Sequence, residues 1–200
     1  MTKDKVDARK DLCIILQFTE NQIPPEPILS LKLKTSLERE DNSYTDQTPQ
    51  TGLDFVHFRK SCKPPWTEYN HHCYLKGQTE VTWAEAKAEC EDMCSHLVVI
   101  DNMEESNWLA KAFLRKNNCP TDIFADCTAW TGGNDLEVEG QYRWNNSNVT
   151  MIFTYWSPNE PSLSKPSAAY TRDCIDLLKT AKWNDRPCSY LNSFICEKSY

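Results

Sequence analysis

The chain has 200 residues, of which 40% are hydrophobic and 11% aromatic, and 22 basic and 29 acidic side chains give it a formal net charge of −7. The apolar fraction is sufficient for a packed core and excludes a wholly disordered chain. No apolar run reaches the roughly 20 residues that a membrane-spanning helix needs. The acidic balance, with no basic patch along the sequence to collect phosphates, argues against a nucleic-acid partner and favours metal cations.

Cysteine is the most informative residue type in this sequence. Ten cysteines are present, and nine of them follow position 61. No two form a CxxC pair, and the triplet His71-His72-Cys73 lacks a second pair of ligands at zinc spacing. Cysteine at this density is typical of disulfides and therefore of a secreted, extracellular protein. Two sequons agree with that compartment and predict Asn145 and Asn148 as glycosylation sites.

The first 61 residues differ in composition from the rest. They include the proline cluster Pro24-Pro25-Glu26-Pro27, and Ser, Thr, Asp, Gln and Pro dominate from 41 to 51, which predicts a flexible stalk or leader over 1–61. The first 16 residues lack the apolar stretch of a secretory signal. Either the true start is missing, which we favour, or export is unconventional, or the disulfide interpretation is wrong. All seven tryptophans follow position 61, so a folded domain is predicted over 62–200.

Two helices are predicted near the start of this domain. Thr82-Trp83-Ala84-Glu85 is a capping box, and apolar side chains then recur at helical spacing through Cys90. A second helix begins near Asn102 and ends at Asn117-Asn118-Cys119-Pro120. The β-branched run His96–Ile100 between them predicts a short buried strand, and short strands and loops follow residue 128. Helices followed by sheet and loops, with disulfides, indicate an α+β fold.

A series of motifs follows in order across 62–200. Those of the helical part are Trp66, Cys73-Tyr74, Trp83-Ala84-Glu85-Ala86, Cys90, Glu105 and Leu109. Those of the later part are Trp130-Thr131-Gly132-Gly133-Asn134-Asp135, Trp144, Trp156-Ser157-Pro158-Asn159-Glu160-Pro161-Ser162, Asp173-Cys174, Trp183-Asn184-Asp185, Cys188 and Phe194-Ile195-Cys196-Glu197. In this order they closely resemble a C-type lectin-like domain. The resemblance implies two helices packed on small antiparallel sheets, with a long irregular loop region and disulfide staples.

The same resemblance assigns three disulfides. They are Cys62–Cys73, Cys90–Cys196 and Cys174–Cys188, and the second joins the first helix to the last strand. Four cysteines remain, namely Cys13, Cys94, Cys119 and Cys127. We hypothesise that Cys94 pairs with Cys119 or Cys127. The one left over would then meet Cys13 or a partner chain, which would make a homo-oligomer.

The resemblance further implies a calcium-dependent sugar site. In sugar-binding members, carboxylate and amide side chains hold a calcium ion, and two vicinal sugar hydroxyls displace water from it. Calcium takes six to eight such oxygen ligands. Carried over to this chain, the metal ligands and the carbohydrate-binding residues are the same four: Glu160, Ser162, Asn184 and Asp185. Pro161 is expected to be a cis-proline, and Trp156 to pack in the core. The Glu-Pro motif points to mannose-, glucose- or fucose-type sugars.

Two departures from the family pattern weaken this site. Ser162 replaces an asparagine, so an amide becomes one shorter hydroxyl. Arg172 stands immediately before Asp173-Cys174, where the resemblance expects a glutamate, and its guanidinium adds a positive charge that cannot be neutralised. Calcium is therefore expected to bind weakly or not at all.

A second calcium site, present in some members, is expected to be empty. Asp135, Glu139 and Asp173 stand at matching positions, but Leu163 stands where another acid is needed, and Arg172 intrudes again. We expect Asp135 and Glu139 to serve as loop and turn residues.

Three functions compete at this point. The first is a secreted, calcium-dependent lectin that binds glycans or glycoproteins in recognition or innate defence. The second keeps the fold without the metal and binds a protein, ice or a mineral surface, with Arg172 bridging Glu160 or Asp173. The third, an enzyme, is not supported, because no Gly-rich phosphate loop, Gly-x-Ser-x-Gly motif or zinc-protease histidine pair is present. We therefore predict a binding protein without catalytic residues.

Overall fold

The structure is a computed structural model of the chain, and the residues that it describes are 13, 61–116, 118–162 and 171–200. The chain divides into two units between residues 59 and 60, and everything below concerns the second unit. Apart from residues 13 and 61, the predicted stalk lies outside the described residues, and so does Leu163. Among the helices of the described part, none has the length and apolar character to cross a membrane.

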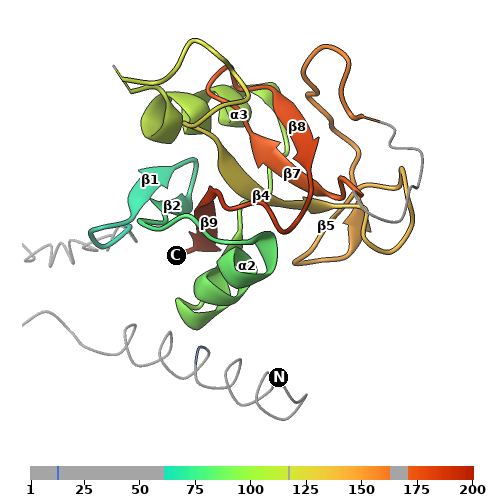
Figure 1. Cartoon of the computed structure of the whole chain (residues 1–200). Helices are drawn as coiled ribbons and strands as arrows, with labels where there is room; N and C mark the ends of the chain where they lie inside the picture. The colour runs from blue at the N-terminus through green and yellow to red at the C-terminus, as the bar shows by residue number, and fades with distance from the viewer. Residues whose placement is uncertain (1–12, 14–60, 117, 163–170) are drawn as a thin grey trace, which may run out of the picture. The chain divides into compact units, whose positions relative to one another are not determined.

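The second unit has helices in its first half and strands mostly in its second (Figure 1). The first half contains β1 (Thr67–Tyr69), β2 (His72–Lys76), α2 (Trp83–Asp92), β3 (His96–Leu97), α3 (Met103–Leu109) and the π-helical segment η1 (Ala110–Leu114). The second half contains β4 (Ala129–Asn134), β5 (Arg143–Trp144), β6 (Val149–Thr150), β7 (Cys174–Leu177), β8 (Trp183–Arg186) and β9 (Ser193–Ser199). The α+β prediction is confirmed.

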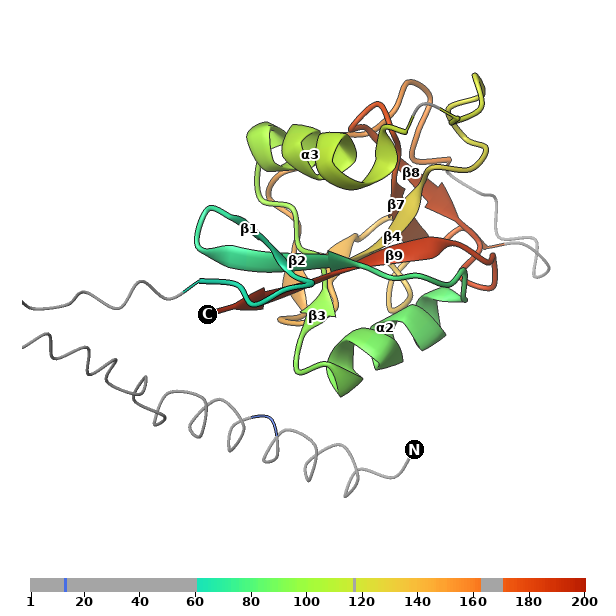
Figure 2. The ribbon, with the colours of Figure 1, turned by 90° about the vertical axis from the view of Figure 1, so that its left-hand side faces the viewer.

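The last strand, β9, organises the sheet. The strand order is β1-β2-β9-β4-β5-β6, with β3 also paired to β9, and with β7 paired to both β4 and β8. β9 runs antiparallel to β2 and parallel to β4. Figure 2 shows α3 on one side of the β2–β9 layer and α2 on the other. Because β2 lies near the start of the domain and pairs with β9, its last strand, the two ends of the domain lie on the same part of the sheet.

The helix α2 forms as its sequence predicts. The backbone N–H of Thr82 donates to Glu85 Oε2 at 3.0 Å, and the Glu85 N–H donates back to Thr82 Oγ1 at 3.4 Å, which completes the capping box. Trp83, Ala86 and Cys90 are buried on one face. The indole N–H of Trp83 donates to the Thr131 carbonyl at 2.8 Å, which anchors the helix to β4.

The second helix is capped in a different way. The Asn102 side chain accepts from the Glu105 N–H at 2.8 Å. The Glu105 carboxylate reaches past the cap, where it accepts from the Asp101 N–H at 3.0 Å and from the Tyr74 hydroxyl at 2.6 Å. Burial raises the pKa of Glu105, and these two hydrogen bonds oppose that rise. The cap is thereby joined to β2.

The strand predicted over His96–Ile100 is shorter than expected. Only His96 and Leu97 pair with β9 as a strand. Beyond them the Val98 N–H still donates to the Ile195 carbonyl at 2.9 Å, but the Val99 N–H donates to the Glu197 carboxylate. A side chain replaces the neighbouring backbone at that point, so the regular pairing ends there.

Four disulfides join pairs of cysteines within residues 62–200. Three are the pairs that the resemblance implies: Cys62–Cys73, Cys90–Cys196 and Cys174–Cys188. The fourth, Cys119–Cys127, shows that the proposed pairing of Cys94 with either of these residues is wrong. The two residues are eight positions apart in the sequence, and a turn of the chain after η1 brings their Cα atoms to 5.8 Å. No described cysteine is a free thiol.

Candidate functional site

The predicted site begins with a loop that is tied to β8. The Ser157 N–H donates to the Trp183 carbonyl at 2.8 Å, and the Glu160 N–H donates to the Ser157 carbonyl at 3.0 Å. The Glu160–Pro161 peptide is cis, as the resemblance implies. These bonds place the Glu160 and Ser162 side chains beside the middle of β8.

Ser162 is the centre of the site. Its hydroxyl oxygen lies 3.0 Å from Glu160 Oε2 and 2.9 Å from Asp185 Oδ1, and its backbone N–H donates to the same Asp185 oxygen at 3.1 Å. One hydroxyl proton serves one of the two carboxylates at a time. Glu160, Ser162 and Asp185 thus form a compact oxygen-rich group, which we call the carboxylate site.

Burial sets the electrostatics of the carboxylate site. Asp185 is fully buried, and its second oxygen accepts from the Tyr142 hydroxyl at 3.2 Å. The pKa of Glu160 is raised, first by burial and then by the nearby Asp185, while the Ser162 hydrogen bond and the Arg172 charge oppose the rise. Two carboxylates held this close favour a proton or a cation between them.

Arg172 supplies a cation at the edge of the site. Its Nη1 donates to Ser162 Oγ at 3.1 Å, and the side chain is otherwise exposed. The expected bridge to Glu160 or Asp173 is therefore replaced by a bond to the hydroxyl between the two carboxylates. The guanidinium stands where the family pattern has an acid, and its charge opposes part of the rise in the Glu160 pKa.

Asn184 is the one predicted ligand that no described contact brings to the site. Its side-chain amide donates to Asp176 Oδ1 at 3.0 Å. Successive side chains of a strand point to opposite faces, so Asn184 and Asp185 face opposite sides of β8. Asp176 is fully buried and also accepts from Arg186 Nε at 2.6 Å.

Sequence reasoning missed two residues around this strand. Tyr142, whose hydroxyl donates to Asp185, is one of eight tyrosines in the chain, and its partner is not visible in the sequence. Asp176 carried a signal, since it is an acid inside the apolar run Cys174–Leu178. A charge in such a run points to a buried pair, and Arg186 is that partner. Trp156 packs against Tyr142 with ring centroids 4.8 Å apart, in agreement with its predicted core role.

The acids of the second calcium pattern do not form a closed set. Asp135 is buried, its Oδ2 accepts from the Gly140 N–H at 2.8 Å, and its Oδ1 has no partner in the described structure. Burial raises the pKa of Asp135 to about 6, with the charges of Glu139 and Asp173 adding to the rise. Within 61–116, 118–162 and 171–200, no three His, Cys, Asp or Glu side chains are grouped as a metal site.

The two predicted glycosylation sites differ in their surroundings. Asn148 is exposed, and its side chain accepts from Arg143 at 3.3 Å. Asn145 is partly buried, and its side-chain oxygen lies inside without a described partner, close to the backbone of Gly132. An attached glycan is accommodated more easily at Asn148.

Comparison with known proteins identifies the domain. Residues 79–198 match the profile of the family described as the C-type lectin domain, which is more than half of the chain. The chain belongs to the C-type lectin domain family. It is 30% identical over 134 residues to a hepatic lectin of Gallus gallus, and the match covers 66% of this chain and 58% of that protein. This C-type lectin chain therefore spans less than two thirds of that relative.

Solved structures agree with the family. The carbohydrate-recognition domain of the human scavenger receptor C-type lectin superposes with a TM-score of 0.61 at 29% identity, covering 70% of this chain and all of that domain. A calcium-independent type II antifreeze protein superposes with a TM-score of 0.57 at 23% identity, covering 72% of this chain and 98% of that one, and this likeness concerns the fold alone. The fold therefore occurs in a carbohydrate-recognition domain and in a calcium-independent protein.

Proposed function

We propose that this C-type lectin domain is a secreted carbohydrate-binding module that recognises glycans at the carboxylate site with the help of a weakly held calcium ion. The observation that carries the proposal is the convergence of Glu160, Ser162 and Asp185 from two distant segments. The preference expected from the Glu-Pro motif is for mannose-, glucose- or fucose-type sugars. A binding role without catalysis is in keeping with a lectin family.

The residues present fit calcium only in part. Two carboxylates and a hydroxyl converge on one point, and these are the hard oxygen ligands that calcium prefers. Glu160, Ser162 and Asp185 would hold the ion, and they are fewer than its usual six to eight ligands. The bound ion would offer its open positions to two sugar hydroxyls. The carboxylates would then accept hydrogen bonds from those hydroxyls, which orients the sugar.

A second candidate drops the metal. Arg172 already places a positive charge at the carboxylate site through its bond to Ser162, and the Asn184 amide is engaged by Asp176. In this candidate the guanidinium takes the electrostatic place of the ion, and the domain binds its partner without calcium. The calcium-independent antifreeze protein has the same fold.

A calcium titration of the full chain separates the two candidates. Tryptophan fluorescence is the readout, because Trp183 precedes Asn184 and packs against Trp156. A saturable change in the millimolar range is expected, as for weak extracellular sites. Arg172→Glu is expected to increase the affinity for calcium at least tenfold, because a carboxylate that binds the ion replaces a guanidinium that repels it. Lys198→Glu makes the same charge change on β9 and is expected to leave calcium affinity unaltered.

Glycan binding completes the test. Immobilised mannose-, fucose- and galactose-terminated glycans are to be compared in calcium and in chelator. Binding of the first two that is lost in chelator supports the calcium-dependent function. Binding that persists in chelator, with no fluorescence change up to about 10 mM calcium, supports the second candidate. No glycan binding in either condition rejects the carbohydrate function.

A further inference from the structure

Basic side chains gather on one part of a domain that is acidic overall. Residues 62–200 carry 13 basic and 19 acidic side chains. Five of the 13 come from three places in the fold: Lys76 at the end of β2, Lys111, Arg115 and Lys116 in and after η1, and Lys179 in the turn between β7 and β8. We call these five residues the basic surface.

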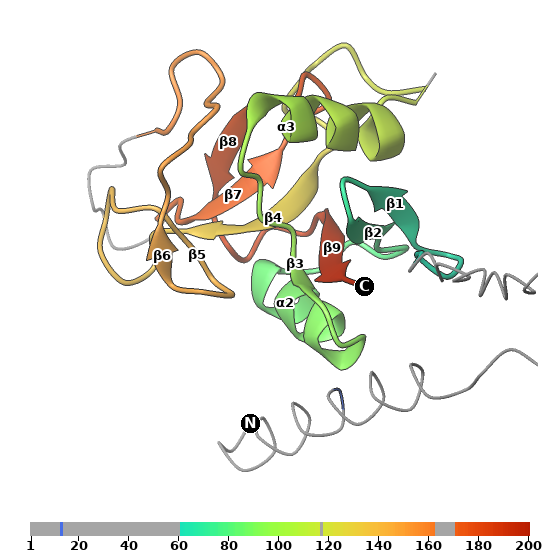
Figure 3. The same ribbon diagram turned by 180° about the vertical axis from the view of Figure 1, so that it is seen from behind.

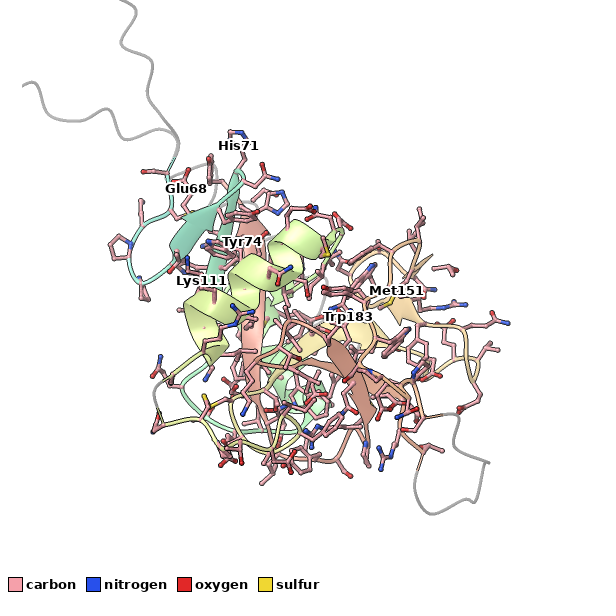
Figure 4. The ribbon with its side chains drawn as sticks, turned by 90° about the horizontal axis from the view of Figure 1, so that it is seen from above. Glu68, His71, Tyr74, Lys111, Met151 and Trp183 are labelled. Carbon is pink, nitrogen blue, oxygen red and sulfur yellow. A yellow bond between two sulfur atoms is a disulfide. The ribbon has the colours of Figure 1, made fainter. Side chains whose placement is uncertain are left out.

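Contacts between the elements bring these five residues together. Arg115 Nε donates to the Lys179 carbonyl at 3.0 Å, although 64 positions separate the two residues. Lys111 lies within η1, and the Arg115 N–H closes that segment by donating to the Ala110 carbonyl at 2.9 Å, so the two residues belong to one turn of the chain. Figure 4 shows Lys111 beside that segment. The pKa of Lys76 is lowered, first by burial and next by the charge of Lys116, so these two ammonium groups lie within electrostatic reach.

The positive charge of the basic surface is not neutralised by ion pairs. The ion pairs formed by His72, Lys87, Arg143 and Arg186 in the described part of the chain include none of these five residues. The side chains of Arg115 and Lys179 instead bond to carbonyl groups, the second through a 3.2 Å bond from Lys179 Nζ to the Asp122 carbonyl. A carbonyl fixes an ammonium group without cancelling its charge. The charge of Glu80 partly opposes the lowering of the Lys76 pKa.

A disulfide and a hydrogen bond hold the elements of the basic surface in place. The Cys119–Cys127 disulfide closes the loop that follows η1. The turn that carries Lys179 is held to α3 by the Ser106 hydroxyl, which donates to the Ala181 carbonyl at 2.7 Å. Cations at a helix C-terminus complement the helix dipole, which accounts for Lys111, Arg115 and Lys116. That explanation does not reach Lys76 or Lys179, which belong to other elements.

The geometry points to the basic surface as a binding site for a sulfated polysaccharide, separate from the carboxylate site. A chain with regularly spaced sulfates meets several cations at once, and each contact releases bound counterions. Disulfides are typical of an oxidising, extracellular setting, where sulfated polysaccharides rather than nucleic acids are the common polyanions. In Figures 1 and 3, η1 and β5 lie at opposite ends of the domain, and β5 is on the side of the loop that leads to Ser162. The basic surface and the carboxylate site therefore lie on different parts of the domain.

Heparin binding by the full chain tests this proposal. The measurement is affinity for a heparin fragment in chelator, from 50 to 300 mM salt, so that the carboxylate site does not contribute through calcium. The wild type is expected to bind, with an affinity that falls as salt rises. Lys111→Gln/Lys116→Gln is expected to weaken binding about tenfold. Lys87→Gln/Lys198→Gln removes the same charge elsewhere on the domain and is expected to change affinity less than twofold.

Three results would overturn the proposal. The first is absence of heparin binding by the wild type at 50 mM salt. The second is an equal loss in the two double variants, which would indicate a response to net charge alone. The third is equal affinity for a single-stranded DNA of matched charge, which would show a general polyanion surface. Fully desulfated heparin is expected not to bind, and Arg115→Gln gives a second variant if the first double variant does not fold.

Discussion

The two faces of β8 handle buried carboxylates in different ways. On one face Asp176 is fully buried, Arg186 Nε lies 2.6 Å from it, and the Asn184 amide donates to its other oxygen. On the opposite face Asp185 is also fully buried, but the cation near it, Arg172, is exposed and bonds to a hydroxyl. A cation built into the core makes a closed structural pair. An exposed cation that bonds to a hydroxyl does not make such a closed pair with Asp185.

Removing the built-in cation is expected to have the largest effect. Arg186→Gln leaves Asp176 buried without its counter-charge, which is expected to lower the free energy of unfolding by about 3–5 kcal/mol. Urea denaturation at pH 7 with the disulfides intact measures this. Asp176→Asn added to Arg186→Gln should restore part of the loss. Lys87→Gln breaks an exposed pair with Glu91 and is expected to cost under about 0.5 kcal/mol.

If Arg186→Gln were no more costly than Lys87→Gln, the contrast between the two faces would not hold. Asp176 would then be protonated in the native protein and would not need the arginine. A stable Arg186→Gln variant whose stability rises on acidification would indicate that outcome.

A buried acid without a cation should respond to pH. Burial raises the pKa of Asp135 to about 6 from an ordinary 3.8. The folded state then holds the proton more tightly than the unfolded state, so the stabilisation is present below pH 4 and is lost as pH rises through 6. Asp135→Asn is expected to match the wild type near pH 4 and to exceed its unfolding free energy by about 2–3 kcal/mol at pH 7.5.

Denaturation curves at both pH values test this expectation. Glu89→Gln, which removes an exposed acid of α2, is the control for the loss of one negative charge. A difference between Asp135→Asn and the wild type that does not vary with pH would contradict the predicted shift.

The smallest effect is expected at the exposed cation. Arg172→Gln removes one surface hydrogen bond to Ser162, so the free energy of unfolding should change by less than about 1 kcal/mol. The same denaturation measurement applies. A loss as large as that of Arg186→Gln would mean that Arg172 stabilises the fold. That result would weaken the calcium-dependent function more than the calcium-independent one, in which Arg172 takes the place of the ion.

Short-range motifs in the sequence were sufficient to predict the helices, because a helix depends mostly on residues that are close in the sequence. The Thr82–Glu85 capping box and the buried face of α2 needed only short-range information. The family resemblance supplied the fold and three of the disulfides, including Cys90–Cys196, whose residues are 106 positions apart. The pairing of Cys119 with Cys127 was missed because it depends on how the chain turns after η1, which no motif records.

The sequence predicted which residues belong to the site, but not where each of their side chains points. Glu160, Ser162 and Asp185 meet as their motifs indicate. The Asn184 side chain instead bonds to Asp176. Asp176 lies opposite Asn184 because of the register of β7 against β8, which the sequence does not show. The basic surface was invisible for the same reason, since its members are spread over more than 100 positions and only tertiary contacts join them.

The Cys90–Cys196 bridge has a mechanical consequence. The two residues lie 106 positions apart in the sequence, and Cys196 is close to the end of the domain. A pull applied to residues 62 and 200 would pass through this bond and through Cys62–Cys73, and would bypass the chain between 91 and 195. The carboxylate site and most of the basic surface lie within that bypassed stretch. The domain could therefore bear tension between its ends while its binding surfaces stay unloaded.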